Sequence, residues 1–279
     1  WTEVTREGRR IAEIPSHLEE PLVDARPRLF SAGPRELRSA LLLPQGREPD
    51  GPLPVLLDPY AGPVVNTVLR ERDEYLASQW FADQGFAVLL TDGRGTPGRG
   101  AAWERAIHRD VLGPVLEDQI DALRAAAERF GFLDLTRVAI RGWSFGGELA
   151  AAAVLRRPDV FHAAVVGAPV TDQRLYDTHY NERYLGHPDR EPEVYRQSSV
   201  LFDAPSLERP ILLIHGLDDD NCYVAHSLKL SQALTEAGKP HIFLPLAGIT
   251  HRPLDETVAE NLLLLQLRFL RQSLGLPTE

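Results

Sequence analysis

The segment from residue 138 to 147, VAIRGWSFGG, constrains the fold of this chain more than any other feature of the sequence. It starts as an apolar run, passes through a Gly-x-Ser-x-Gly pattern centred on Ser144, and continues into a leucine and a string of alanines. This order predicts a strand, a sharp turn that strains the serine backbone, and a helix. Only glycine at Gly142 and Gly146 lets the chain pass so close to itself. We therefore expect the Ser144 hydroxyl to be exposed at the carboxyl edge of a sheet, above a helix N-terminus.

Apolar runs typical of strands alternate with longer segments of helical periodicity along the rest of the chain. The expected strands are 37–43, 55–57, 87–91, 138–140, 163–166, 211–214 and 242–246. Helical spacing joins Leu116, Ile120, Leu123, Ala127 and Phe130, and an apolar stripe with Leu262, Leu265 and Phe269 predicts a C-terminal helix within 254–274. Together with the serine turn, this alternation predicts an α/β-hydrolase fold, a mostly parallel, doubly wound sheet with helices on both faces.

Length and composition indicate one globular α/β domain and exclude several kinds of partner. Residues 1–30 lack periodicity and are expected to form an N-terminal arm, and residues 31–279 to form the catalytic domain. A net charge of −10 without a basic stripe disfavours nucleic acid and anionic membranes, and no segment approaches the roughly 20 apolar residues of a membrane span. The single cysteine, Cys222, cannot form an internal disulfide. This leaves the compartment open and slightly favours the cytoplasm.

Ser144 needs a base to take its proton, and the base needs a carboxylate to orient it. In this fold the acid and then the histidine follow the serine in the chain. Three histidines follow both Ser144 and the acidic cluster at 218–220. His241 lies in a strand pattern and His226 in a helical one, whereas His251 lies in a loop between the last strand and the last helix. His251 is therefore the expected base.

The acidic partner is expected in the segment LDDDNC, which follows the apolar run at 211–214. Spacing does not decide which of Asp218, Asp219 and Asp220 serves, and at least one of them is expected to be a solvated cap. His215, at the end of the preceding strand, is expected to pack there rather than to act in catalysis.

Several ordered motifs, from about Leu37 to the C-terminus, together resemble the prolyl oligopeptidase family of serine peptidases, especially its dipeptidyl peptidase IV branch. They are LDPYAGP at 57–63, DGRG at 92–95, LEDQI at 116–120, GWSFGG at 142–147, APV at 168–170, YNERY at 180–184 and the His-Gly pair at 215–216. The resemblance implies Asp219 as the acid of a triad with Ser144 and His251. It also implies an oxyanion hole made by the Tyr60 hydroxyl and the backbone N–H of Phe145.

The resemblance further implies a substrate pocket for a small residue. Its expected members are Trp143, Val170, Tyr176, Tyr180, Asn221 and Cys222. Without the resemblance, Tyr60 would be a half-buried aromatic at a strand end, and Tyr176 and Tyr180 an i, i+4 core pair. The chain departs from the family at two positions. Gln173 stands where the dipeptidyl peptidase pattern usually has tryptophan, and Phe145 where tyrosine is usual.

These observations predict a serine peptidase that works through an acyl-enzyme, needs no metal or cofactor, and releases short N-terminal peptides after Pro or Ala. An acylaminoacyl-peptidase or carboxylesterase of the same fold, and a non-catalytic interaction domain, are the alternatives. Relatives in this family carry an N-terminal β-propeller, to which residues 1–30 would connect. The pair Glu19-Glu20 is expected to be solvated rather than to hold a substrate amine. A homodimer could form through the leucine-rich face around Leu262 to Leu265.

Overall fold

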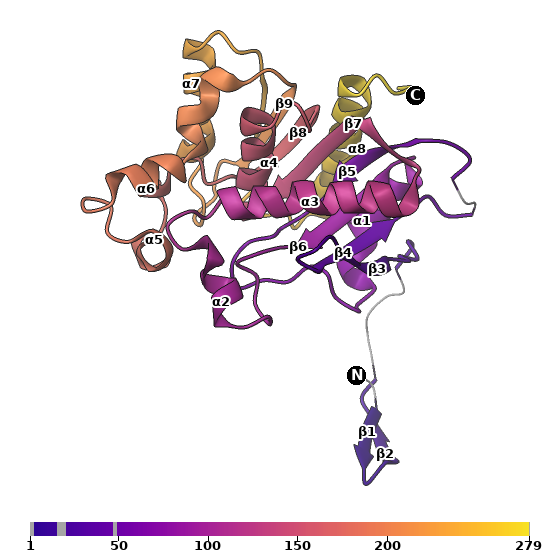
Figure 1. The fold of residues 1–279 in the computed structure, drawn as a ribbon. Coiled ribbons are helices and arrows are strands. Elements are labelled where there is room, and N and C mark those ends of the chain that lie inside the picture. The colour runs from indigo at the N-terminus through magenta and orange to yellow at the C-terminus, as the bar shows by residue number, and fades with distance from the viewer. Residues whose placement is uncertain (1–2, 16–20, 47–48, 279) are drawn as a thin grey trace.

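The computed structural model describes residues 3–15, 21–46 and 49–278, and an eight-stranded sheet forms the centre of the molecule (Figure 1). The strand order is β10-β9-β8-β7-β5-β6-β4-β3. All neighbours are parallel except the two pairs made by β4, with β6 and with β3. The strands are β3 (Arg28–Ala32), β4 (Leu37–Leu42), β5 (Leu53–Leu57), β6 (Ala87–Asp92), β7 (Leu133–Trp143), β8 (Ala163–Gly167), β9 (Ile211–Gly216) and β10 (Ile242–Leu246).

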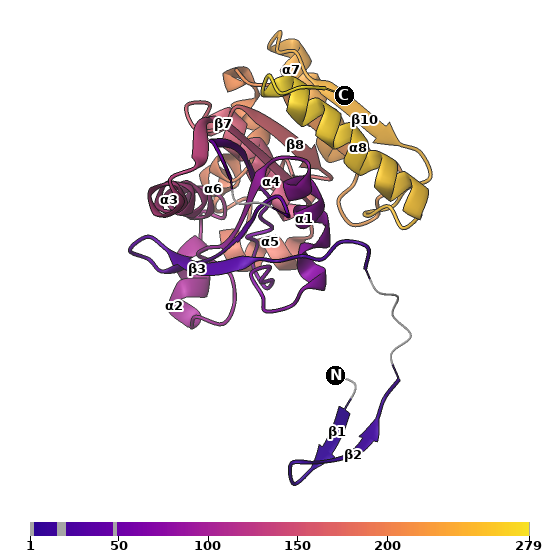
Figure 2. The ribbon, with the colours of Figure 1, turned by 90° about the vertical axis from the view of Figure 1, so that its right-hand side faces the viewer.

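Helices cover both faces of this sheet, so the predicted doubly wound α/β architecture is confirmed. Side chains of α3, α4 and α7 pack together in one apolar cluster, and those of α1 and α8 in another. Figure 2 shows α3 and α8 on opposite sides of the sheet. The helices are α1 (Leu76–Asp83), α2 (Ala101–Glu104), α3 (Gly113–Phe130), α4 (Phe145–Arg156), α5 (Thr178–Leu185), α6 (Pro192–Gln197), α7 (Ala225–Glu236) and α8 (Glu256–Ser273).

Burial explains why the central strands read as continuous apolar runs. Every residue of β6, β8 and β9 is buried, as expected for parallel strands that are covered on both faces. The edge strand β10 is only half-buried. The residue directly before this strand is the polar His241, whose ring forms a hydrogen bond with Ser231 of α7.

The apolar stripe of α8 differs in one position from the sequence prediction. Leu262 and Phe269 are buried, but the side chain of Leu265 is 45% exposed. The buried face instead continues from Leu262 to Gln266 and then to Leu270, in steps of four residues. A drift of this kind follows from the 3.6-residue period of a helix.

The N-terminal segment contains strands that the sequence did not reveal. β1 (Glu3–Arg6) and β2 (Arg9–Glu13) pair as an antiparallel hairpin, which lies apart from the main sheet in both views (Figures 1 and 2). Glu7 and Gly8 at its turn both have positive φ, the conformation that two-residue hairpin turns favour. The strand β3 also begins earlier than the first strand expected. Glu19-Glu20 lies outside the described residues.

Two of the sequence motifs tie the end of β6 to α3. The Arg94 guanidinium donates to the fully buried Asp118 carboxylate, with Nη2 to Oδ1 at 2.8 Å. The Gln119 side chain donates to the backbone carbonyl of Thr91 at 3.1 Å. The DGRG and LEDQI motifs therefore anchor a helix beside the strands that carry the site.

Candidate active site

Ser144 occupies the tight bend between β7 and α4 that the sequence predicts. Its backbone has φ 59° and ψ −122°, a conformation that a non-glycine residue adopts only under strain. A Cβ atom at Gly142 would collide with the carbonyl of Gly146, and one at Gly146 would lie 2.6 Å from the carbonyl oxygen of Pro59. The steric need for both glycines is therefore confirmed.

The loops that follow four strands of the sheet meet at its carboxyl edge. Tyr60 follows β5, Ser144 follows β7, Asp219 follows β9 and His251 follows β10. In open α/β sheets this edge is where ligands bind. The sheet thus gathers side chains that are far apart in the sequence.

Asp219 is distinguished from its neighbours by burial and by its hydrogen bonds. Its side chain is fully buried, whereas Asp218 and Asp220 are exposed. Its Oδ1 accepts from the backbone N–H groups of Asn221 at 2.9 Å and Cys222 at 2.8 Å. These bonds hold the Asp219 side chain in one orientation, with Oδ2 left to face His251.

His251 joins this carboxylate through its ring. Nδ1 lies 2.8 Å from Oδ2 of Asp219, so Nδ1 donates and Nε2 becomes the basic nitrogen. The backbone carbonyl of His251 accepts from the indole Nε1 of Trp143 at 2.6 Å, which fixes the histidine loop beside the serine turn. Within the described residues Ser144 Oγ forms no hydrogen bond with His251. Such bonds commonly tighten only when substrate binds.

The other two histidines that the sequence left open are engaged elsewhere. His226 is buried in α7, where its Nδ1 accepts from the backbone N–H of Thr171 at 3.1 Å. His241 lies at the start of β10, with its Nε2 2.7 Å from the hydroxyl of Ser231. Neither ring contacts Asp219.

His215 has a closer relation to the site than packing alone. Its buried Nε2 lies 2.6 Å from the backbone carbonyl of Cys222 and 3.3 Å from Oδ2 of Asp219. A carbonyl oxygen can only accept, so Nε2 carries the hydrogen and Nδ1 accepts from the Ser227 hydroxyl at 2.7 Å. Burial lowers the pKa of His215, which keeps the ring neutral. In the sequence, the feature that pointed to His215 was the His-Gly pair at the end of the strand, one of the motifs shared with the family.

Tyr60 and Cys222 both lie close to the serine hydroxyl. Burial raises the pKa of Tyr60, an effect partly offset by its hydrogen bond with the Ser144 side chain. Ser144 Oγ lies 4.0 Å from the Cys222 sulfur. Burial also raises the pKa of the Cys222 thiol to about 12. The thiol therefore stays protonated at neutral pH and does not act as a nucleophile. The Phe145 ring lies 6.2 Å from that of Tyr60, centroid to centroid.

A small cavity of about 70 Å³ opens beside Ser144. Tyr176 and Tyr180 form one wall, with their rings perpendicular and 5.6 Å apart, and burial raises the pKa of Tyr176 to about 12. The Tyr176 hydroxyl donates to Asn221 Oδ1 at 3.2 Å. The full lining is Tyr60, Pro63, Val64, Val111, Ser144, Phe145, Glu148, Val170, Gln173, Tyr176, Tyr180 and Asn181.

Trp143 is not among the lining residues of this cavity. Its indole ring packs against Gly167, where an added Cβ would collide with the ring, and its N–H reaches the carbonyl of His251. Two polar lining residues, Glu148 and Asn181, were missed in the sequence. The available signal for Glu148 was a single acidic residue within the otherwise apolar first turns of α4.

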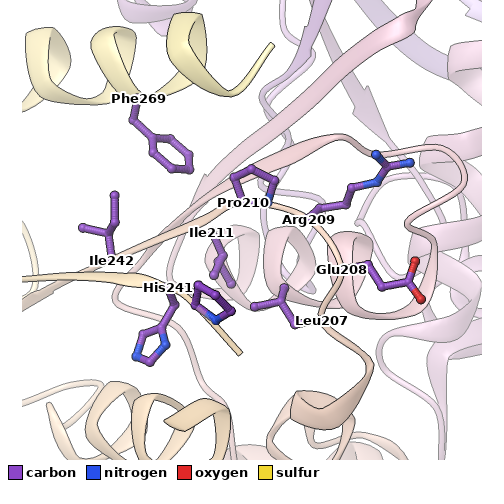
Figure 3. Close-up of a pocket in the computed structure, with 9 residues that line it drawn as sticks. Leu207, Glu208, Arg209, Pro210, Ile211, His241, Ile242 and Phe269 are labelled. Carbon is purple, nitrogen blue, oxygen red and sulfur yellow. The ribbon is translucent and has the colours of Figure 1, made fainter. Parts of the chain in front are cut away.

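The structure also contains a larger cavity of about 400 Å³, drawn in Figure 3. Residues at the amino ends of β9 and β10 line it, including Ile211 and Ile242, with Phe269 of α8 facing them. The charged ends of Glu208 and Arg209 point away from these apolar groups. Because the serine turn lies at the carboxyl ends of the strands, this cavity is separate from the reaction site.

Among residues 3–15, 21–46 and 49–278, no group of three or more His, Cys, Asp or Glu side chains is arranged to hold a metal ion. No helix in this part of the chain combines the length and apolarity that a membrane crossing requires.

The sheet order, the strained serine and the Asp219–His251 pair are those of a serine hydrolase with the α/β-hydrolase fold. A sequence model of the prolyl oligopeptidase family matches residues 74–277. The chain therefore belongs to the prolyl oligopeptidase family, as its motifs predicted.

The relatives that the chain resembles include proteins named dipeptidyl peptidases. The chain is 36% identical to human (Homo sapiens) dipeptidyl peptidase 8 over 244 residues, which cover 86% of this chain and 27% of the relative. It is 34% identical to pig (Sus scrofa) dipeptidyl peptidase 4, over 85% of this chain and 31% of the relative. The crystal structure of Porphyromonas gingivalis dipeptidyl peptidase 4 superimposes with a TM-score of 0.83 at 26% identity, over 95% of this chain and 38% of that one. The chain thus spans about a third of the proteins that it matches.

Proposed function

We propose that this chain is the catalytic region of a serine dipeptidyl peptidase that releases short N-terminal peptides after a small residue such as Pro or Ala. The observation that carries the proposal is the hydrogen bond between His251 and the buried Asp219, beside a strained Ser144. Relatives named dipeptidyl peptidases support the choice of substrate. A cavity of about 70 Å³ suits a small side chain.

In the proposed mechanism, Ser144 Oγ attacks the substrate carbonyl carbon while His251 Nε2 takes the hydroxyl proton. Asp219 stabilises the imidazolium that forms and keeps its own negative charge. His251 then gives the proton to the departing amine, and an acyl-enzyme remains. Water, deprotonated by the same nitrogen, attacks the acyl carbonyl and releases the peptide.

The negative charge that develops on the carbonyl oxygen needs donors placed in advance. The Tyr60 hydroxyl and the backbone N–H of Phe145, at the start of α4, would supply them. Loss of one such donor typically costs about 3 kcal/mol of transition-state stabilisation.

The test is turnover by the 279-residue chain and by its Ser144→Ala variant, with a fluorophosphonate as probe of the serine. We expect labelling of the parent only, and hydrolysis of Gly-Pro and Ala-Pro anilides that the variant loses. Faster turnover of acetyl-Ala substrates or short-chain esters would indicate the acylaminoacyl-peptidase or carboxylesterase alternative instead. A parent that is neither labelled nor active would favour the non-catalytic interaction domain.

We further propose that residues 1–30 connect the catalytic domain to an N-terminal β-propeller. The proposal is supported by the family resemblance and by relatives about three times as long as the chain. A longer polypeptide containing repeated four-stranded units before residue 1 is the expected finding.

A homodimer is the final part of the proposal. Leu264 and Leu265 of α8 leave their side chains 46% and 45% exposed, an apolar surface that a second copy could cover. Light scattering over a concentration series should show the dimer, and Leu265→Glu should dissociate it. A monomer at every concentration would contradict this part of the proposal.

A further inference from the structure

The Glu148 carboxyl group lines the cavity beside Ser144. Glu148 lies in the first turn of α4, four residues after the serine turn. Only 1% of the residue is exposed to solvent, yet it lines the cavity together with the Tyr180 ring. A buried acid of this kind needs a charged or hydrogen-bonding partner.

The single partner of this carboxyl group in the described chain is Gln173. The Gln173 side-chain N–H donates to Glu148 Oε1 at 2.5 Å and also to the backbone carbonyl of Ser198 at 3.2 Å. Gln173 Oε1 in turn accepts from the Asn181 amide at 2.9 Å. These bonds use both hydrogens of the Gln173 amide and fix its orientation. They leave Glu148 Oε2 without a partner among the described residues.

Burial determines the protonation state of this group. Removal from water raises the pKa of Glu148 well above its ordinary value, and the bond from Gln173 and the more distant charge of Arg156 only partly oppose this. Burial therefore favours the neutral, protonated form of Glu148. Because Oε1 accepts the Gln173 hydrogen, the acid proton lies on Oε2. Protonated Glu148 thus offers one O–H donor to the cavity that the Tyr180 ring also lines.

We propose that Glu148 Oε2 is a specificity-determining group that hydrogen-bonds the hydroxyl of a small substrate side chain, so that serine is preferred to alanine next to the cleaved bond. The inference rests on the function proposed above. Alanine fits the cavity by size but leaves a buried donor unpaired, which is the origin of the discrimination. Long or branched polar side chains are excluded by the volume of about 70 Å³.

The test compares Gly-Ser, Gly-Ala and Gly-Pro aminomethylcoumarin substrates, which differ only in the residue that enters the cavity. In Glu148→Leu, kcat/KM for the serine substrate should fall about tenfold relative to alanine, the value of one hydrogen bond. Glu148→Gln should restore the ratio, because its amide can donate into the cavity while its oxygen still accepts from Gln173. Glu128→Leu, on the exposed face of α3, is the matched control and should leave the ratio unchanged. An equal serine-to-alanine ratio in the parent and in Glu148→Leu would overturn the inference.

A second readout separates this inference from the proposed function. The dipeptides Gly-Ser and Gly-Ala, as products, should protect Ser144 from a fluorophosphonate. The Gly-Ser concentration needed should be about tenfold lower, and this advantage should vanish in Glu148→Leu. If the coumarin substrates are not cleaved but the serine is labelled, the peptidase proposal fails and protection still decides the role of Glu148. Equal protection by both dipeptides in the parent would overturn that role.

Discussion

Trp143 and His251, which are 108 residues apart in the sequence, are joined by a hydrogen bond of 2.6 Å from the indole N–H to the histidine carbonyl. The tryptophan is the last residue of β7, directly before the serine turn. The bond therefore links the strand before the proposed nucleophile to the loop that carries the proposed base.

Trp143→Phe should lower kcat about tenfold and leave KM nearly unchanged, because the loop of His251 loses one anchoring bond while the aromatic packing on Gly167 remains. Steady-state kinetics on Ala-Pro anilide and the rate of fluorophosphonate labelling both report this. Trp103→Phe is the matched control, since it removes a similar indole bond to the Gly93 carbonyl, away from the site. Equal losses of kcat in both variants would show that the Trp143 bond has no special part in catalysis.

His215→Phe should reduce the free energy of unfolding by about 2 kcal/mol, because the Cys222 carbonyl and the Ser227 hydroxyl lose their buried partner. Because His215 also supports Asp219, we expect kcat to fall in the folded variant. Urea denaturation and kinetics measure the two effects separately. His162→Phe, which removes the bond to the backbone N–H of Val138, should affect stability only. An unchanged kcat in His215→Phe would restrict that residue to a structural role.

The stability of the fold should decrease in acid because of His226. Burial lowers the pKa of this histidine to about 4 from an ordinary 6.5. Smaller effects come from His215, Asp172, Lys229 and Asp219, in that order. Between these pH values the unfolded chain binds more protons than the native state, so the free energy of unfolding falls as the pH falls.

The full effect of His226 amounts to roughly 3 kcal/mol below pH 4. His226→Asn should reduce this pH dependence, whereas His187→Asn, at an exposed position, should retain it. Urea titrations from pH 7 to about pH 4 make the comparison. The same slope in the parent and in His226→Asn would contradict the assignment.

The thiol of Cys222 should be unreactive in the native protein. Its side chain is fully buried and its pKa is raised to about 12, so almost no thiolate exists at pH 8. Titration with a thiol reagent should detect no thiol before urea is added and one thiol per chain afterwards. Rapid reaction of the native protein, with loss of activity, would show that the site opens in solution.

The sequence by itself determined the strand alternation and the position of the strained serine turn. Gly142 and Gly146 can be read from the sequence because the constraint is steric and local, acting between atoms a few residues apart. The buried parallel strands can be predicted equally well, since most of their residues are apolar. The hairpin of β1 and β2 is not, because its side chains from Arg9 to Glu13 are all exposed and carry no apolar pattern.

Only the tertiary structure decided which side chains meet at the carboxyl edge of the sheet. Spacing left Asp218, Asp219 and Asp220 open, and only the family resemblance implied Asp219. What physically distinguishes it is burial and the backbone donors that the loop fold supplies. The raised pKa of Glu148 arises only in the folded chain, where the residue is buried and Gln173, 25 residues away in the sequence, bonds to it. Sequence patterns record local sterics and periodic burial, whereas hydrogen bonds and pKa shifts arise from neighbours that only the folded chain brings together.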